Sequence, residues 1–143
     1  MKPLHVLLAA LWPLMAGAQD APELVVFPAG EIAFDAQMFV TRPLLVFADS
    51  PNDPNFQRQM DLLARDPVSL ADRDVVVVVD ADPAARSEWR QKFRPRGFSL
   101  VLLDKDLQPE IRKPLPWDVR EITAAIDKFP LRRQEVLEQF PGR

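Results

Sequence analysis

Five consecutive valines form the stretch that most limits how this chain can fold. They occupy residues 75–79, between Asp74 and Asp80. A strand with one face in water alternates apolar and polar residues, whereas a strand covered on both faces is continuously apolar and rich in β-branched residues. The run therefore predicts a central parallel strand. Because parallel neighbours need a crossover connection, usually a helix, the sequence predicts an α/β fold.

Further strands and helices are predicted on both sides of this run. Apolar segments bounded by turn residues predict strands at residues 24–27, 44–48 and 98–103, and residues 110–113 read as the return arm of a hairpin. Helical spacing of apolar residues predicts helices over 55–65, 83–93 and 118–129. A final short helix with Leu131, Leu137 and Phe140 is expected to pack on the sheet, and residues 31–42 fit either a loose helix or a loop. The order predicts a mixed sheet with helices on both faces.

The first 18 residues have the pattern of a secretory signal peptide. Lys2 gives a basic start, residues 4–15 form an apolar core, and Ala16-Gly17-Ala18 matches an A-x-A cleavage site. A membrane anchor is the alternative, but the apolar run is shorter than the roughly 20 residues that span a bilayer. We expect cleavage near Ala18, no stable membrane anchor afterwards, and a periplasmic or secreted protein. Residues 19–143 then form a single domain.

Composition argues against several kinds of chemistry. The chain has no cysteine, and its one histidine, His5, lies in the predicted signal peptide. The predicted mature part lacks the commonest nucleophile, general base and zinc ligand, so we favour a protein that is not an enzyme and expect no cofactor. Acidic residues outnumber basic ones by 21 to 18, which gives no general attraction to nucleic acid.

Three segments resemble a known family. They are "RPLLVFADSPNDPNFQRQMDLLA", "RDVVVVVDAD" and "RGFSLVLLDKDLQPEIRKPLPWDVREITAAIDKFPLRRQE". Together they resemble the bacterial domain-of-unknown-function family 4174 of the DUDES group, over residues 35–138. The resemblance implies export and a thioredoxin-like three-layer α/β/α fold with a mixed sheet and a βαβαββα core. It also implies a suspected link to peroxiredoxin-type chemistry.

The same resemblance shows where this chain departs from a thioredoxin. The strand at residues 44–48 matches the active-site strand, so the two-cysteine motif would fall near Pro51, Asn52, Asp53 and Pro54, where neither cysteine is present. In the place of the thioredoxin cis-proline stands Phe98-Ser99. Because thiolate attack is the thioredoxin mechanism, thiol redox chemistry is not carried over to this chain.

A cluster of polar residues at the ends of two strands is the candidate binding site. Its predicted members are Asp49, Ser50, Asn52, Asp53, Asp80 and Asp82. Carboxylate oxygens suit calcium or magnesium, whereas the same charges would repel an anion from the helix start. The competing interpretation is structural, since Asp53-Pro54 and Asp82-Pro83 each look like an N-cap followed by a proline at the first helical position. The structural interpretation is the stronger of the two, so we name these six residues as a candidate binding site and do not assign a metal to them.

A basic run lies in the helix predicted after Asp82. It comprises Arg86, Arg90, Lys92, Arg94 and Arg96. Such a run is usually a solvated helix face. It would also suit an acidic partner, with Trp89 as an anchor if its ring is exposed.

The preferred functional hypothesis is an exported, non-redox thioredoxin-like module that binds an unknown protein or peptide partner. Two alternatives stay open: an oxidoreductase of the thioredoxin or peroxiredoxin group with unestablished activity, and a divalent-cation-binding domain that uses the aspartates. The sequence does not indicate an oligomeric state.

Overall fold

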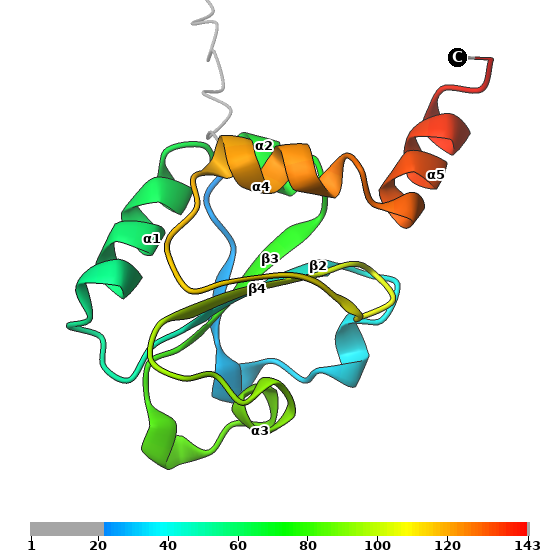
Figure 1. Cartoon of the computed structure of the whole chain (residues 1–143). Coiled ribbons are helices and arrows are strands. Elements are labelled where there is room, and N and C mark those ends of the chain that lie inside the picture. The colour runs from blue at the N-terminus through cyan, green and yellow to red at the C-terminus, as the bar shows by residue number, and fades with distance from the viewer. Residues whose placement is uncertain (1–21, 143) are drawn as a thin grey trace, which may run out of the picture.

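The computed structural model describes residues 22–142 (Figure 1). The predicted signal peptide at residues 1–18 lies outside this range. The strands are β1 Val26–Pro28, β2 Arg42–Phe47, β3 Val75–Asp80, β4 Ser99–Leu103 and β5 Pro109–Lys113. The α-helices are α1 Pro54–Ala64, α2 Pro67–Ala71, α3 Glu88–Phe93, α4 Val119–Ile126 and α5 Pro130–Gln139. Single 3-10 turns lie at η1 Ala29–Glu31, η2 Asp35–Gln37 and η3 Pro83–Ala85.

The strands form one five-stranded mixed sheet in the order β1-β3-β2-β4-β5. The valine strand β3 lies between β1 and β2 and is parallel to both. On the other side of β2, strands β4 and β5 are antiparallel and form the predicted hairpin. In this register Phe47 pairs with Asp80 and also with Ser99, so the ends of β2 and β3 meet the start of β4 at one end of the sheet.

Two apolar cores cover the two faces of the sheet. Helices α1, α2 and α4 lie over one face, with Leu63, Leu70 and Ile122 buried against β2 and β4 (Figure 1). Helix α3 lies over the opposite face, where the side chain of Trp89 is fully buried. The predicted three-layer α/β/α arrangement with its mixed sheet is confirmed.

Several predicted boundaries are wrong. The first strand begins at Val26 instead of residue 24. The helix predicted over residues 83–93 is two separate elements, η3 and α3, because Arg86 between them adopts a left-handed conformation with φ 46° that no helix continues. The short helix α2 was not predicted. Of residues 31–42, which fitted either a loose helix or a loop, residues 32–41 form a loop with the 3-10 turn η2 inside it, and Arg42 already belongs to β2.

Within residues 22–142, no helix combines the length and the apolar character that crossing a membrane requires.

Candidate functional site

The predicted site lies where β2 and β3 end, at the beginning of α1, and we call this region the corner. Asp49 is exposed in the turn that leaves β2, and the Ser50 hydroxyl accepts a hydrogen bond of 3.1 Å from the backbone N–H of Asn52. Asp53 is the N-cap of α1. Its carboxylate accepts hydrogen bonds from the backbone N–H groups of Asn55, at 2.8 Å, and of Phe56, at 3.3 Å.

Capping uses two of the four corner aspartates. Asp82 is the N-cap of η3, and its carboxylate accepts a bond of 3.2 Å from the N–H of Ala84. Both Asp53 and Asp82 are followed by a proline at the first position of the element, as predicted. Their carboxylates therefore compensate backbone N–H groups that would otherwise lack a partner.

We expect Asp53→Ala to lower the free energy of unfolding by about 1 kcal/mol, because the substitution removes the side-chain cap of α1. Urea unfolding of the purified variant measures this change. Asp49→Ala is the matched control: it removes an exposed aspartate four residues earlier that makes no cap, and its effect should stay within about 0.5 kcal/mol. Equal losses for the two variants would contradict the capping role.

Asp80 is the buried member of the corner, and a charged partner from α3 neutralises it. The guanidinium Nη2 of Arg90 lies 2.9 Å from Asp80 Oδ1 and also donates to the backbone oxygens of Ala48, at 2.9 Å, and of Asp80, at 3.0 Å. The Ser87 hydroxyl donates to the other carboxylate oxygen. Burial by itself raises the pKa of Asp80, but the hydrogen bonds from Arg90 and Ser87 outweigh burial and hold this pKa below its usual value.

Arg90 thus fills the place in which a cation would be held. The predicted corner aspartates are not drawn together around a common point. Among residues 22–142, the one group of three carboxylates whose oxygens lie within 4.8 Å of one another is Asp104, Asp106 and Glu110, at the β4–β5 turn. That group is not a free site either, because Asp104 is paired with an arginine.

Beside Asp80 the surface is hollowed into a pocket of about 370 Å³. Small or apolar residues line most of it, with polar groups at one side. They are Pro28, Ala29, Gly30, Pro51, Val79, Asp80, Ala81, Asp82, Ala85 and Ser87. We call this hollow the corner pocket. Its size and lining suit an apolar side chain of a bound segment, held beside fixed polar groups.

The basic run is divided between structural and exposed residues. Trp89 is fully buried and its indole N–H donates to the Ile32 carbonyl at 2.9 Å, so the condition on which a Trp89 anchor depended, an exposed ring, is not met. Arg90 is held by Asp80. The ammonium of Lys92 lies 4.4 Å from the centre of the Phe34 ring.

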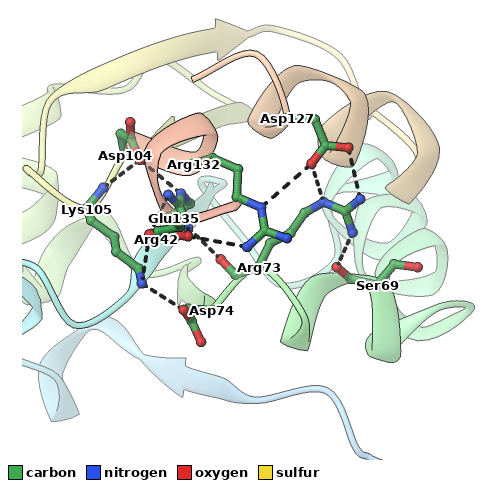
Figure 2. Close-up of polar contacts among 9 residues, drawn as sticks. All are labelled: Arg42, Ser69, Arg73, Asp74, Asp104, Lys105, Asp127, Arg132 and Glu135. Carbon is green, nitrogen blue, oxygen red and sulfur yellow. Dashed lines mark hydrogen bonds and ion pairs between the residues drawn. The ribbon is translucent and has the colours of Figure 1, made fainter. Parts of the chain in front are cut away.

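A second polar cluster, at the opposite end of the sheet, was not predicted (Figure 2). At its centre is Arg42, the first residue of β2, whose side chain is fully buried. Arg42 Nε donates to Asp104 at 2.9 Å, its two terminal nitrogens donate to Glu135 at 3.1 and 2.9 Å, and one of them also donates to the Arg73 carbonyl at 3.1 Å. Every nitrogen of the guanidinium therefore has an acceptor, which a buried charge requires.

Further ion pairs surround this centre. The ammonium of Lys105 lies 2.7 Å from Asp74 and 3.0 Å from Glu135. Arg73 forms a two-pronged pair with Asp127, at 2.8 and 3.0 Å. The cluster joins the start of β2, the β4–β5 turn, the end of α4 and α5, and its charges are balanced, so we assign it a structural role.

Helix α5 is attached to the domain by these charges and not by an apolar face. None of its residues is buried, and Leu137 and Phe140 are 58% and 51% exposed. Arg132 donates to Glu135 at 3.3 Å, one turn along the helix. The expectation that this helix packs on the sheet is wrong: it extends away from the body of the domain (Figure 1).

This attachment should depend on pH. Burial raises the pKa of Glu135, but hydrogen bonds from Arg42 and Lys105 outweigh burial and lower the pKa from 4.5 to about 2. A carboxylate with a lowered pKa contributes stability above its unfolded pKa, and this contribution is lost as the pH falls through the folded value. We expect the free energy of unfolding to decrease between pH 4.5 and 2, and we expect Glu135→Gln to flatten this dependence. Urea unfolding across the range tests both, and an unchanged slope in the variant would contradict the assignment.

Comparisons with known proteins agree with this geometry. The model of a family described as a domain of unknown function (DUF4174) matches residues 39–135. No curated protein sequence matches the chain. Among solved structures, a thioredoxin from Thermus thermophilus is similar with 20% identity and a TM-score of 0.55, over 83% of this chain and 92% of the thioredoxin. Chloroplastic thioredoxin z is similar with 16% identity and a TM-score of 0.53, over 76% of this chain and 98% of that one. These likenesses show a thioredoxin-like fold.

Proposed function

The chain belongs to the DUF4174 family, and from this membership and its thioredoxin-like fold without cysteines we propose that it is an exported, non-redox module that binds an extended segment of another protein at the corner. Binding would use the end of the sheet at which thioredoxins place their thiols. Export rests on the signal-peptide pattern of the first 18 residues.

One observation carries the proposal: the corner keeps a hollow but has no reactive group. Pro51, Asn52, Asp53 and Pro54 stand where the resemblance puts the thiols, and Asp53 caps the helix. Beside them lies the corner pocket of about 370 Å³. A pocket lined by small side chains, with fixed polar groups along one side, supports recognition of a bound segment.

The geometry supports the two alternatives less well. An oxidoreductase of this fold needs a thiolate, and none of the 143 residues is a cysteine. A cation bound by the corner aspartates would have to displace Arg90 from Asp80. It would also have to replace the backbone N–H groups of α1 and η3 that now bond to Asp53 and Asp82. Each displacement removes an interaction that the fold already uses.

The first test is for thiol chemistry. In an insulin assay with dithiothreitol, the purified protein should give no reduction above the rate without protein, with a bacterial thioredoxin as the positive control. Saturable turnover that scales with protein concentration would overturn the non-redox part of the proposal.

The second test is for binding at the corner pocket. Peptides that bind the purified protein would be selected from a random displayed library and measured by fluorescence anisotropy. We expect Ala85→Phe, which fills the corner pocket, to weaken the selected peptides by at least about tenfold. Ala84→Phe is the control, because Ala84 is an exposed neighbour in η3 that does not line the pocket. Equal affinities for the two variants, or no selected peptide, would contradict the proposal.

Export has its own test. The protein recovered from the periplasmic fraction or the medium of its host should begin at Gln19 when its N-terminus is sequenced. A protein that stays in the cytoplasm and retains residues 1–18 would contradict export.

A further inference from the structure

A second hollow, of about 390 Å³, lies at the edge of the sheet formed by β4 and β5. Four basic residues line it, Arg94, Arg96, Arg112 and Lys113, and the remaining lining residues are Phe98, Ser99 and Pro114. We call it the basic groove. No carboxylate lines it, although acidic residues outnumber basic ones in the whole chain. The groove is therefore a local concentration of positive charge on a protein of net negative charge.

The cations of the basic groove are not used in ion pairs. Among the described residues, the basic partners in salt bridges are Arg42, Arg73, Arg90, Lys105 and Arg132. None of these lines the groove. Uncompensated like charges in one hollow repel one another, and a negatively charged ligand would relieve this repulsion.

Two of the four cations are held in position without being neutralised. The guanidinium of Arg112 donates to the carbonyls of Phe93, at 2.7 Å, and Arg94, at 3.3 Å, at the end of α3. The ammonium of Lys113 lies 4.7 Å from the centre of the Trp117 ring. Carbonyl oxygens and an aromatic face orient these groups but leave their full charge available to a ligand.

The groove lies beside an open strand. Strand β5 is at the edge of the sheet, with β4 on one side and no strand of residues 22–142 on the other. An edge strand presents backbone N–H and C=O groups to which an extended peptide can add as a further strand. A peptide would use this row of groups together with the cations, whereas a small anion would use the cations alone.

Charge also fixes which part of β5 such a peptide would approach. At the start of the strand, burial together with Asp104 and Asp106 raises the pKa of Glu110, which marks an acidic neighbourhood. At its end stand Arg112 and Lys113. An acidic segment is repelled from the first end and attracted to the second.

The groove and the corner pocket lie at the same end of the sheet. Ser99, which lines the groove, pairs with Phe47, and Phe47 pairs with Asp80, which lines the corner pocket.

We propose that the partner of this module is an acidic extended peptide, which adds to the β5 edge and places its carboxylates in the basic groove. The inference rests on the proposed function, because it takes the partner to be a polypeptide. It adds a second surface, the basic groove and the β5 edge, and a specific chemistry, carboxylates that bind to arginine and lysine.

The probe is a fluorescein-labelled decapeptide of alternating glutamate and valine, compared with a peptide in which every glutamate is replaced by glutamine. We expect the purified protein to bind the glutamate peptide at least about tenfold more tightly, with an affinity that falls as sodium chloride rises, because exposed charges are screened. The double variant Arg94→Gln, Arg96→Gln should lose about tenfold of this affinity. Arg58→Gln, Arg65→Gln, which removes two exposed arginines of the α1 region, should change it less than about twofold.

Three results would overturn the inference: equal affinity for the two peptides, equal affinity of the two double variants, or displacement of the peptide by sulfate at an ionic strength at which sodium chloride does not displace it. The last result would assign the groove to small anions. The proposed function fails separately, because a neutral selected peptide that depends on Ala85 and not on Arg94 would leave corner binding intact.

Discussion

Arg42→Met should lower the free energy of unfolding by about 3–5 kcal/mol, the largest loss we expect from any single substitution in this chain. The reason is the pair it breaks. Arg42 and Asp104 have side chains 0% and 2% exposed and are joined at 2.9 Å. Without the guanidinium, the buried carboxylate of Asp104 loses its charged partner. Removing one partner of a buried ion pair costs much more free energy than the intact pair contributes. Urea unfolding measures the loss.

Two further variants make this prediction specific. The double variant Arg42→Met, Asp104→Leu should recover part of the lost stability, because it removes both buried charges together. Arg120→Met, at an exposed position on α4, should change the free energy of unfolding by less than about 0.5 kcal/mol. A loss below about 1 kcal/mol for Arg42→Met would show that the cluster does not hold the fold together.

Arg90→Met should have the second largest effect, also about 3–5 kcal/mol at neutral pH. Asp80 and Arg90 have side chains 4% and 11% exposed, and Arg90 also donates to the Ala48 carbonyl at the end of β2. The substitution leaves the Asp80 carboxylate buried with only the Ser87 hydroxyl and a backbone N–H as donors.

The pH dependence distinguishes a lost charge partner from lost packing. In the unaltered protein Arg90 helps to lower the pKa of Asp80, so this stabilisation is present above the unfolded pKa and is lost as the pH falls. The deficit of Arg90→Met should therefore be largest at neutral pH and shrink as the pH falls towards the lowered pKa of folded Asp80, below which this carboxylate is protonated in both proteins. Arg96→Met, an exposed member of the same basic run, should show no such deficit. A deficit independent of pH would contradict the charge-pair account.

Much of the fold followed from local sequence signals. The five valines predicted a central strand, and the structure places β3 between two parallel neighbours. Asp53-Pro54 and Asp82-Pro83 predicted two capped starts, and both caps are made. These features depend on residues that are adjacent in the chain or a few positions apart, where propensity and capping act.

The features that escaped prediction depend on residues far apart in the chain. Arg42 and Asp104 are 62 positions apart and meet only because β2 and β4 pair. Asp80 was predicted as a candidate binding residue, and Arg90 as part of a solvated face, because nothing in the local pattern shows that the start of α3 lies over the end of β3. An arginine at the start of one apolar strand and an aspartate directly after another were the available signals of the Arg42–Asp104 pair.

The prediction that the last helix packs on the sheet was wrong for a related reason. Leu131, Leu137 and Phe140 suggested a packed helix, but the ion pairs of Glu135 with Arg42 and Lys105 decide where it attaches. An amphipathic pattern predicts that a helix exists more reliably than it predicts which neighbour covers it.

The corner has a simple physical interpretation. A thioredoxin-like sheet brings strand ends and a helix start together, and in this chain proline and capping aspartate occupy the positions where the resemblance puts the thiols. What remains is a stable edge with two hollows, one apolar and one basic. Such a surface is suited to the polypeptide binding that we propose.

The most direct test of this account is an NMR titration of the isotope-labelled purified protein with a peptide selected for binding. We expect saturable shifts of the backbone amides around the corner pocket, at Gly30, Ala81 and Ala85, and their loss in Ala85→Phe but not in Ala84→Phe. Shifts confined to the Arg42 cluster or to α5, or no saturable shift with any selected peptide, would contradict the proposal that this domain is a binding module acting through its corner.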